Sequence, residues 1–129
     1  MKSLPVNNRS VCPVSCFLDI LGDKWSVLIV RDMMFTNKKT YKEFLNSPEG
    51  IATNILSSRL VALEKNGFIK KQQDPNNKKV PIYSLTRKGK DLKPILVEVY
   101  LWAEKYFPIP PDILIQIQSY KAQRNASEK

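Results

Sequence analysis

The chain has 129 residues, of which 43% are hydrophobic, and it carries 21 Lys and Arg against 12 Asp and Glu, for a formal charge of +9. This length and apolar content predict one folded globular domain with a substantial core, and they argue against a disordered chain. The charge favours a polyanionic partner, either nucleic acid or an anionic membrane surface.

Several kinds of site lack the residues they would need. The absence of histidine excludes histidine-activated nucleophiles and histidine metal sites, and the sequence has no glycine-rich phosphate loop. We therefore predict no enzyme, no catalytic or metal-binding residue and no cofactor. No apolar run reaches the ~18 residues of a membrane span, and the N-terminus lacks the apolar centre of a signal peptide, so we expect a cytoplasmic protein without a membrane partner.

The first predicted helix follows an arm of residues 1–11, which we expect to be flexible. The helix opens at Cys12-Pro13, because proline is favoured at the first helical position, and Cys12 would then be its N-cap. Gly22 is expected to end it.

The second predicted helix is apolar on most sides, which indicates that it lies at the centre of the core. Asp23 is expected to cap it, with Lys24 and Trp25 in its first turn. A basic loop that contains Lys38 and Lys39 follows.

The next stretch predicts a helix-turn-helix. Thr40 and Glu43 form a capping box that opens a short helix, because each side chain can accept the backbone N–H of the other residue. Pro48 and Gly50 then break this helix with a turn.

The second helix of this motif is expected from about Thr53 to Asn66, with Gly67 as its left-handed stop. One side of it is apolar at helical spacing, whereas the other side is short or polar and contains no acidic residue. That outer side consists of Thr53, Asn54, Ser57, Ser58 and Arg59. Such a surface suits a helix in a DNA major groove, although an ordinary polar face of a structural helix-turn-helix is the alternative.

A basic hairpin is predicted after this helix. Residues 68–73 and 80–85 have the composition of two antiparallel strands, and residues 74–79 form a turn-rich connection. The window from residue 68 to residue 93 contains eight basic and two acidic residues, a net +6 of the total +9. The hairpin would thus form a basic wing directly after the candidate recognition helix.

The C-terminal part is predicted to contain one long helix and one short one. Thr86 caps the long helix, which runs to about Phe107 and is expected to kink near Pro94. Its apolar stripe is wide for a helix on a small domain and favours packing against a second subunit, with an intramolecular core as the alternative. The interface residues would be Phe17, Leu96, Val99, Trp102 and Tyr106. Asp112 caps the short helix, and the chain after Lys121 is expected to fray.

These elements predict a mainly α fold with a small antiparallel β-hairpin, a winged helix-turn-helix with a long C-terminal dimerisation helix. We expect three segments. Residues 1–11 form the arm, residues 12–107 form the DNA-binding domain with its dimerisation helices, and residues 108–129 form a short helix and a tail.

Several separate motifs also occur in the order found in a known family. They are Cys12-Pro13-Val14, GDKWSVLIVRD at 22–32, the helix at 51–64, NGFI at 66–69, YSLTRKG at 83–89, and LKPIL at 92–96 with Trp102. Together they resemble the HxlR-type regulators over residues 12–102. The resemblance implies a bacterial, dimeric winged-helix transcription factor, related in fold to the MarR group, that binds palindromic operators near promoters.

The resemblance also implies a possible sensor. Some members of that family detect oxidants or electrophiles, such as quinones and aldehydes, through a cysteine just before the first helix, and Cys12 occupies that position. The chain departs from the family pattern at Ala52, where serine is usual, so we expect Thr53 to supply the cap one residue later. The wing tip also differs, and Cys16 is additional.

The position of Cys12 supports reactivity without the resemblance. A thiol at a helix N-terminus has a lowered pKa, and the nearby Arg9 would add to this effect. The alternative is that the thiol is an inert small hydrophobe, which is the reading we favour for Cys16.

The sequence therefore predicts a homodimeric, sequence-specific DNA-binding transcriptional regulator, a repressor that responds to an oxidant or electrophile through Cys12. Base edges would be contacted by Thr53, Asn54, Ser57 and Ser58. Phosphates of double-stranded DNA would be contacted by Arg59, Lys38, Lys39, Lys78, Lys79 and Arg87. The alternatives are a winged-helix protein-interaction module that does not bind DNA and, weakened by the lack of histidine, a thiol enzyme.

Overall fold

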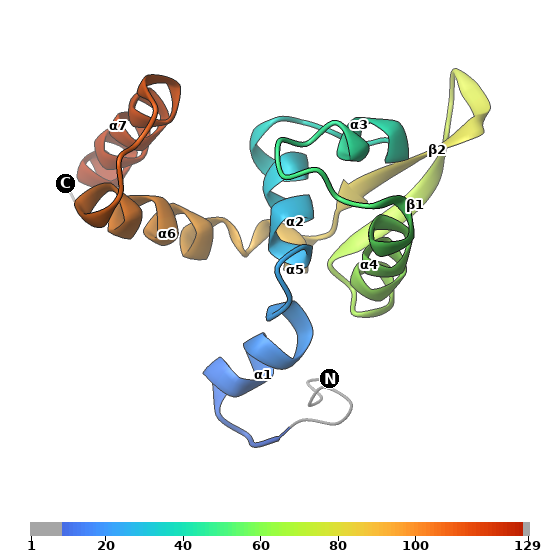
Figure 1. Ribbon diagram of the computed structural model, residues 1–129, viewed down its shortest axis with the longest axis horizontal. Coiled ribbons are helices and arrows are strands. Elements are labelled where there is room, and N and C mark those ends of the chain that lie inside the picture. The colour runs from blue at the N-terminus through green and yellow to red at the C-terminus, as the bar shows by residue number, and fades with distance from the viewer. Residues whose placement is uncertain (1–8, 128–129) are drawn as a thin grey trace. The chain divides into compact units, whose positions relative to one another are not determined.

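The computed structural model describes residues 9–127, except for the side chains of Lys78 and Ser127. The chain divides into two compact units between Lys90 and Asp91. The first contains α1 (Pro13–Leu21), α2 (Ser26–Phe35), α3 (Tyr41–Leu45), α4 (Thr53–Lys65), β1 (Ile69–Asp74), β2 (Asn77–Leu85) and α5 (Arg87–Lys90), and the second contains α6 (Lys93–Tyr106) and α7 (Pro111–Ser127) (Figure 1). The three-segment division that we expected stays a prediction, and most of its first segment lies outside the described residues.

α2 begins later than its sequence pattern suggested. The helix starts at Ser26, so the predicted placement of Lys24 and Trp25 in its first turn is wrong. The N-cap is Trp25, which has no side-chain cap hydrogen bond, so the expectation that Asp23 would cap the helix is wrong. The Asp23 carboxylate instead accepts the N–H groups of Trp25 and Ser26 at 2.8 and 2.9 Å and the Ser26 hydroxyl at 2.6 Å. These hydrogen bonds close a turn over residues 23–26, directly before the helix.

The core of the first unit lies where α2 meets α3, α4 and the hairpin (Figure 1). The buried side chains come from each of these elements and include Ile29, Val30, Met33, Phe44, Leu56, Leu60, Leu63, Ile69 and Tyr83. The rings of Phe44 and Tyr83 meet edge to face with centroids 6.2 Å apart. α2 is thus the central core helix, as its apolar pattern indicated.

The two helices of the helix-turn-helix form where predicted. The capping box of Thr40 and Glu43 opens α3, with both of its hydrogen bonds present. Gly50, in the turn, and Gly67, after α4, have φ angles of 69° and 82°, a region that L side chains rarely adopt. These two glycines fix the direction in which the chain enters and leaves α4.

The wing is an antiparallel pair of strands with Ile69 opposite Leu85 and Gln73 opposite Pro81. Pairing continues to Asp74 and Asn77 through an irregular register, so the predicted connection over residues 74–79 was too long. The backbone N–H of Tyr83 donates to the carbonyl of Lys39 at 2.7 Å, on the outer edge of β2. The loop before α3 is therefore fixed to the base of the wing.

The predicted long helix after Thr86 is two helices, and this expectation was wrong. α5 ends at Lys90, and α6 starts at Lys93 with Pro94 in its first turn. Proline has no N–H with which to continue the hydrogen bonding of a preceding turn, but it is tolerated in the first turn of a helix, so the helix stops and restarts rather than kinking. α5 lies so close to the chain before β1 that a Cβ at Gly89 would come within 2.3 Å of the Phe68 carbonyl oxygen.

The second unit is a pair of helices. α6 and α7 pack through buried Leu96, Ile117 and Tyr120, and the rings of Tyr100 and Tyr120 lie 5.8 Å apart. α7 spans 17 residues, so the predictions of a short segment and of fraying after Lys121 were wrong. Lys121 and Arg124 form ion pairs with Glu104 and Glu98 of α6, which explains why the helix continues beyond its apolar pattern.

The fold class is confirmed, because the structure is mainly helical with a two-stranded antiparallel sheet and contains long C-terminal helices.

Candidate nucleic-acid interface

The outer face of α4 carries the predicted base-reading residues. Burial of Leu56, Leu60 and Leu63 on the opposite side turns Thr53, Asn54, Ser57 and Ser58 outward, where all four are exposed. The N-cap is Ala52, which makes no side-chain cap hydrogen bond, so the expectation that Thr53 would cap is wrong. The backbone N–H groups in this first turn have no side-chain cap, and such groups favour anions.

Tyr41 ties the start of α4 to α3. Its hydroxyl donates to the Thr53 carbonyl at 2.9 Å and accepts the Ser57 hydroxyl at 3.3 Å. Sequence reasoning missed this residue. The only signal was an aromatic residue with a polar tip directly after the capping threonine.

An ion network holds the turn between α3 and α4 against α2. Arg31 donates two 2.7 Å hydrogen bonds to the Glu49 carboxylate and also pairs with Asp32 at 2.9 Å. Asp32 is only 3% exposed, so it depends on these partners for its charge. The hydrogen bonds from Arg31 lower the pKa of Glu49, although burial opposes them. The recognition helix is therefore positioned by charge pairing as well as by apolar packing.

Lys38, predicted to contact phosphate, belongs to this network. Its ammonium lies 3.8 Å from Asp32 and donates to the Ser47 hydroxyl at 3.1 Å, and the side chain is half-buried. The Ser47 hydroxyl in turn donates to Asp32. These contacts place Lys38 in the support of the turn.

Arg59 is also paired within the protein. Its guanidinium lies 3.6 Å from the Asp23 carboxylate and donates to the Ser58 hydroxyl at 3.0 Å. Burial would raise the pKa of Asp23, but the hydrogen bonds from Ser26 and Trp25 outweigh it, and Arg59 lowers the pKa further. Arg59 thus connects the recognition helix to the start of α2.

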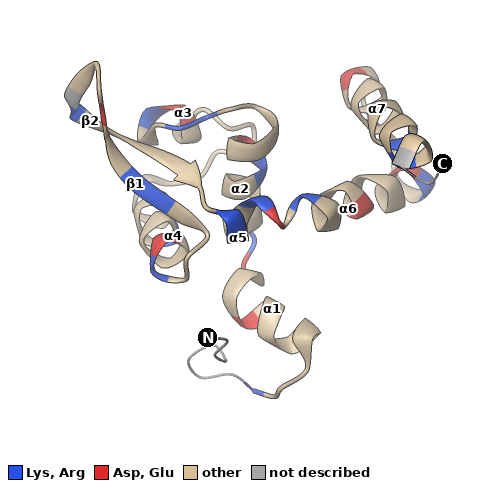
Figure 2. Ribbon diagram, turned by 180° about the vertical axis from the view of Figure 1, so that it is seen from behind, with Lys and Arg blue, Asp and Glu red and all other residues tan. Residues whose placement is uncertain are grey.

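The remaining predicted phosphate contacts lie on the loop before α3, on the wing and on α5. Lys39, Lys79 and Arg87 are exposed, and the side chain of Lys78 lies outside the described part of the structure. Figure 2 shows basic residues on β1, at the wing tip and on α5. Local hydrogen bonds shape the tip, where Asp74 accepts the N–H of Asn76 at 2.9 Å and Asn77 accepts that of Lys79 at 3.2 Å.

Cys12 is exposed and free at the N-cap of α1. The backbone N–H groups of Ser15 and Val14 lower the pKa of its thiol. Arg9 pairs with Asp19 at 2.9 Å instead, so the expectation that Arg9 would lower the pKa of the Cys12 thiol further is wrong. Cys16 is half-buried, and its thiol donates to the Ser10 carbonyl at 3.4 Å.

The residues expected at a subunit interface differ in exposure. Val99, Trp102 and Tyr106 of α6 are 53%, 54% and 67% exposed. Leu96 is buried and Phe17 is half-buried. The exposed apolar face of α6 therefore contains the three outward residues together with Ile95, which was not among those expected.

The sequence profile of the HxlR-like helix-turn-helix family matches residues 20–110. The chain belongs to this family. The identification made from the sequence motifs is thus confirmed, and the chain is a member of a family of helix-turn-helix transcriptional regulators.

Two relatives show how far the likeness within the HxlR-like family extends. The HTH-type transcriptional regulator sll1512 of Synechocystis is 31% identical over 90 residues, which are 70% of this chain and 66% of that protein, just under two thirds of its length. The HTH-type transcriptional regulator YodB of Bacillus subtilis is 31% identical over 99 residues, which are 76% of this chain and 88% of YodB.

Solved structures agree with the assignment to this family. The crystal structure of PA1607 superimposes with a TM-score of 0.72 at 39% identity, covering 81% of this chain and 71% of that one. Quinone-bound YodB superimposes with a TM-score of 0.61 at 30% identity, covering 74% of this chain and 99% of that one.

The described residues offer neither a metal site nor a membrane span. Within residues 9–127, no group of three or more His, Cys, Asp or Glu side chains is arranged to hold a metal ion. None of the helices in the described part of the chain has both the length and the apolarity needed to cross a bilayer.

Proposed function

We propose that this protein is a homodimeric repressor that reads a palindromic operator with α4 and contacts the flanking phosphates with its wing. The observation that carries the proposal is the outward row of Thr53, Asn54, Ser57 and Ser58 on a helix whose position is fixed by Tyr41 and the Arg31 network. Short polar side chains on a fixed helix can reach base edges in the major groove, and asparagine there can form two hydrogen bonds with adenine.

The phosphate contacts come from the residues that remain exposed. Lys39, Lys79 and Arg87 can meet the backbone, together with Lys78. Lys38 and Arg59 are assigned to positioning, because each already pairs with a carboxylate.

Selection of binding sites from genomic fragments tests this proposal. We expect a palindrome whose half-sites lie about one helical turn, ~34 Å, apart. Affinity should fall steeply between low and physiological salt, because several phosphate contacts release counterions. Recovery of no preferred sequence and a flat salt response would favour a protein-interaction module instead.

Dimerisation is supported by the exposed Val99, Trp102 and Tyr106 on one helix. Aromatic side chains of this size, left exposed together, favour a protein interface. Sedimentation of the wild-type chain and of the Trp102→Ser variant tests this. We expect the wild type to be a dimer and the variant to dissociate at micromolar concentration. A monomeric wild-type chain would exclude the dimer.

Control by an electrophile is supported by the exposed, acidified thiol of Cys12. YodB, a relative, has been crystallised with a quinone bound. We expect a quinone or diamide to reduce operator binding by the wild type but not by Cys12→Ser. Equal loss of binding in both proteins would remove Cys12 as the sensor, whereas the DNA-binding proposal would stand.

A further inference from the structure

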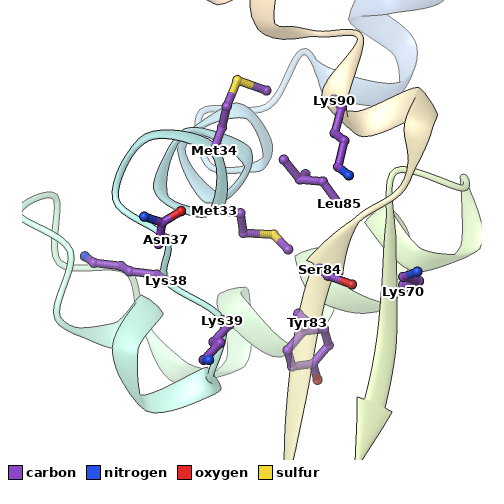
Figure 3. Close-up of a pocket in the computed structure, with 10 residues that line it drawn as sticks. All are labelled: Met33, Met34, Asn37, Lys38, Lys39, Lys70, Tyr83, Ser84, Leu85 and Lys90. Carbon is purple, nitrogen blue, oxygen red and sulfur yellow. The ribbon is translucent and has the colours of Figure 1, made fainter. Parts of the chain in front are cut away.

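A hollow with a basic rim lies beside the base of the wing. It has a volume of about 560 Å³ and is lined by residues of α2, the loop before α3, both strands and α5 (Figure 3). This volume lies within the ~300–1,000 Å³ typical of small-molecule sites. Among its lining residues, Lys39 is also a candidate phosphate contact and Lys38 supports the turn before α4.

Apolar side chains lie among the polar ones that line the hollow. Met33 and Tyr83 are buried at its base, and Met34 and Leu85 are half-buried. In Figure 3, Met33 and Leu85 lie between Lys39 and Lys90. Methionine side chains adapt to the shape of flat or branched apolar groups, so this surface suits the body of an organic molecule.

The rim of the hollow is positively charged. Lys39, Lys70 and Lys90 line it and are exposed, and no acidic residue is among the lining residues. Within the described chain, Lys70 and Lys90 form no ion pair or hydrogen bond, and Lys39 is near enough to Glu43 to lower the pKa of that carboxyl. The fourth lining lysine, Lys38, turns to Asp32 and Ser47. Three exposed lysines thus lie around the hollow, and no acidic residue is among its lining residues.

We propose that this hollow binds a small organic anion with an apolar body, such as an aromatic carboxylate. The lysines hold the carboxylate, and Met33, Met34 and Leu85 contact the ring. A DNA phosphate would use the same charges but has no need of the apolar side chains, which is why the geometry favours the organic anion. The proposal concerns binding to the free protein and does not depend on the operator.

The methionines report occupancy directly. The chain contains three methionines, and two of them, Met33 and Met34, line the hollow, so Met1 provides the reference signal. The full-length protein carrying ¹³C-methyl methionine is titrated with 2-naphthoate, with the neutral 2-naphthamide and with inorganic phosphate. We expect saturable shifts of the Met33 and Met34 methyl signals with 2-naphthoate. The affinity for the amide should be lower by about tenfold or more, since the ion pairs are lost.

Variants of single lysines locate the charge. Lys39→Gln and Lys90→Gln should each weaken 2-naphthoate binding by about threefold. Lys65→Gln, which removes the same charge from the exposed end of α4, should leave the affinity unchanged. Unfolding temperatures of the variants show that each remains folded.

Three results would overturn the proposal. These are the absence of saturable methyl shifts at millimolar 2-naphthoate, equal affinity for the amide, and phosphate affinity equal to that of 2-naphthoate. The last result would identify a simple phosphate contact in place of a site for organic anions.

Discussion

The start of α4 and the tip of the wing are both expected to touch DNA, yet the protein holds them in different ways. The start of α4 is fixed by long-range contacts, from Tyr41 to Thr53 and from Arg31 to Glu49 in the preceding turn. The tip of the wing is shaped by hydrogen bonds between near neighbours, Asp74 with Asn76 and Asn77 with Lys79.

This difference matches the two tasks. A hydrogen bond to a base edge depends on position within a fraction of an ångström, so base-reading side chains need a supported element. A lysine attracted to a phosphate tolerates variation in position, because charge attraction falls off gradually with distance. The long-range contacts are therefore concentrated at the helix whose side chains would contact the bases.

The largest expected effect comes from removing that support. Arg31→Met leaves the Asp32 carboxylate, whose side chain is 4% exposed, without its closest charged partner. Breaking a buried pair in this way costs ~3–5 kcal/mol. Urea unfolding should show this loss, and operator binding should fall with it.

The matched control is Arg9→Met. Arg9 pairs with Asp19, but its side chain is 67% exposed, compared with 21% for Arg31. An exposed pair contributes only ~0–1 kcal/mol. Similar losses in the two variants would show that the Arg31 network gives no special support to the turn.

The next effect concerns base reading itself. Asn54 is exposed in the first turn of α4, and its side chain makes no hydrogen bond to any other described residue. Asn54→Ala should therefore leave unfolding unchanged while removing ~1–3 kcal/mol of discrimination between operator and mutated operator. Competition binding measures this, with Asn125→Ala on α7 as the control. Loss of affinity for all sequences alike would count against base contact.

A smaller effect is expected at the tie between α3 and α4. Tyr41→Phe keeps the ring and removes the hydroxyl that bonds Thr53 and Ser57, which costs ~0.5–1.5 kcal/mol at most. Operator affinity should fall less than in Asn54→Ala. Ser119→Ala, which removes an exposed hydroxyl from α7, should leave operator binding unchanged.

Local patterns predicted the framework of this region well. The capping box at Thr40 and the glycine stop at Gly67 depend on neighbours in sequence. The start of α3 and the end of α4 could therefore be predicted from the residue types alone. Asp23 was expected to cap α2, but its carboxylate closes a turn before the helix and Trp25 is the N-cap, because a short polar side chain stabilises a turn as readily as a helix start.

The support of α4 could not be predicted in the same way. Arg31 and Glu49 are 18 positions apart in the chain, and only folding brings them together. For the same reason Lys38 and Arg59, which look like free cations in the sequence, were assigned to phosphate. The structure gives both of them carboxylate partners, and a charged residue's task follows from its partner as much as from its type.

The smallest expected effect is at the wing tip, and it separates the two regions most directly. Lys79 is exposed at the tip, so Lys79→Ala should weaken binding to operator and to random DNA by the same factor. The slope of log affinity against log salt should decrease by ~1, because one phosphate contact is lost. Lys105→Ala on α6 removes the same charge from another exposed position and should change neither quantity. A Lys79 variant that altered the preference between sequences would mean that the wing reads bases, and the division of tasks between the supported helix and the locally shaped wing would fail.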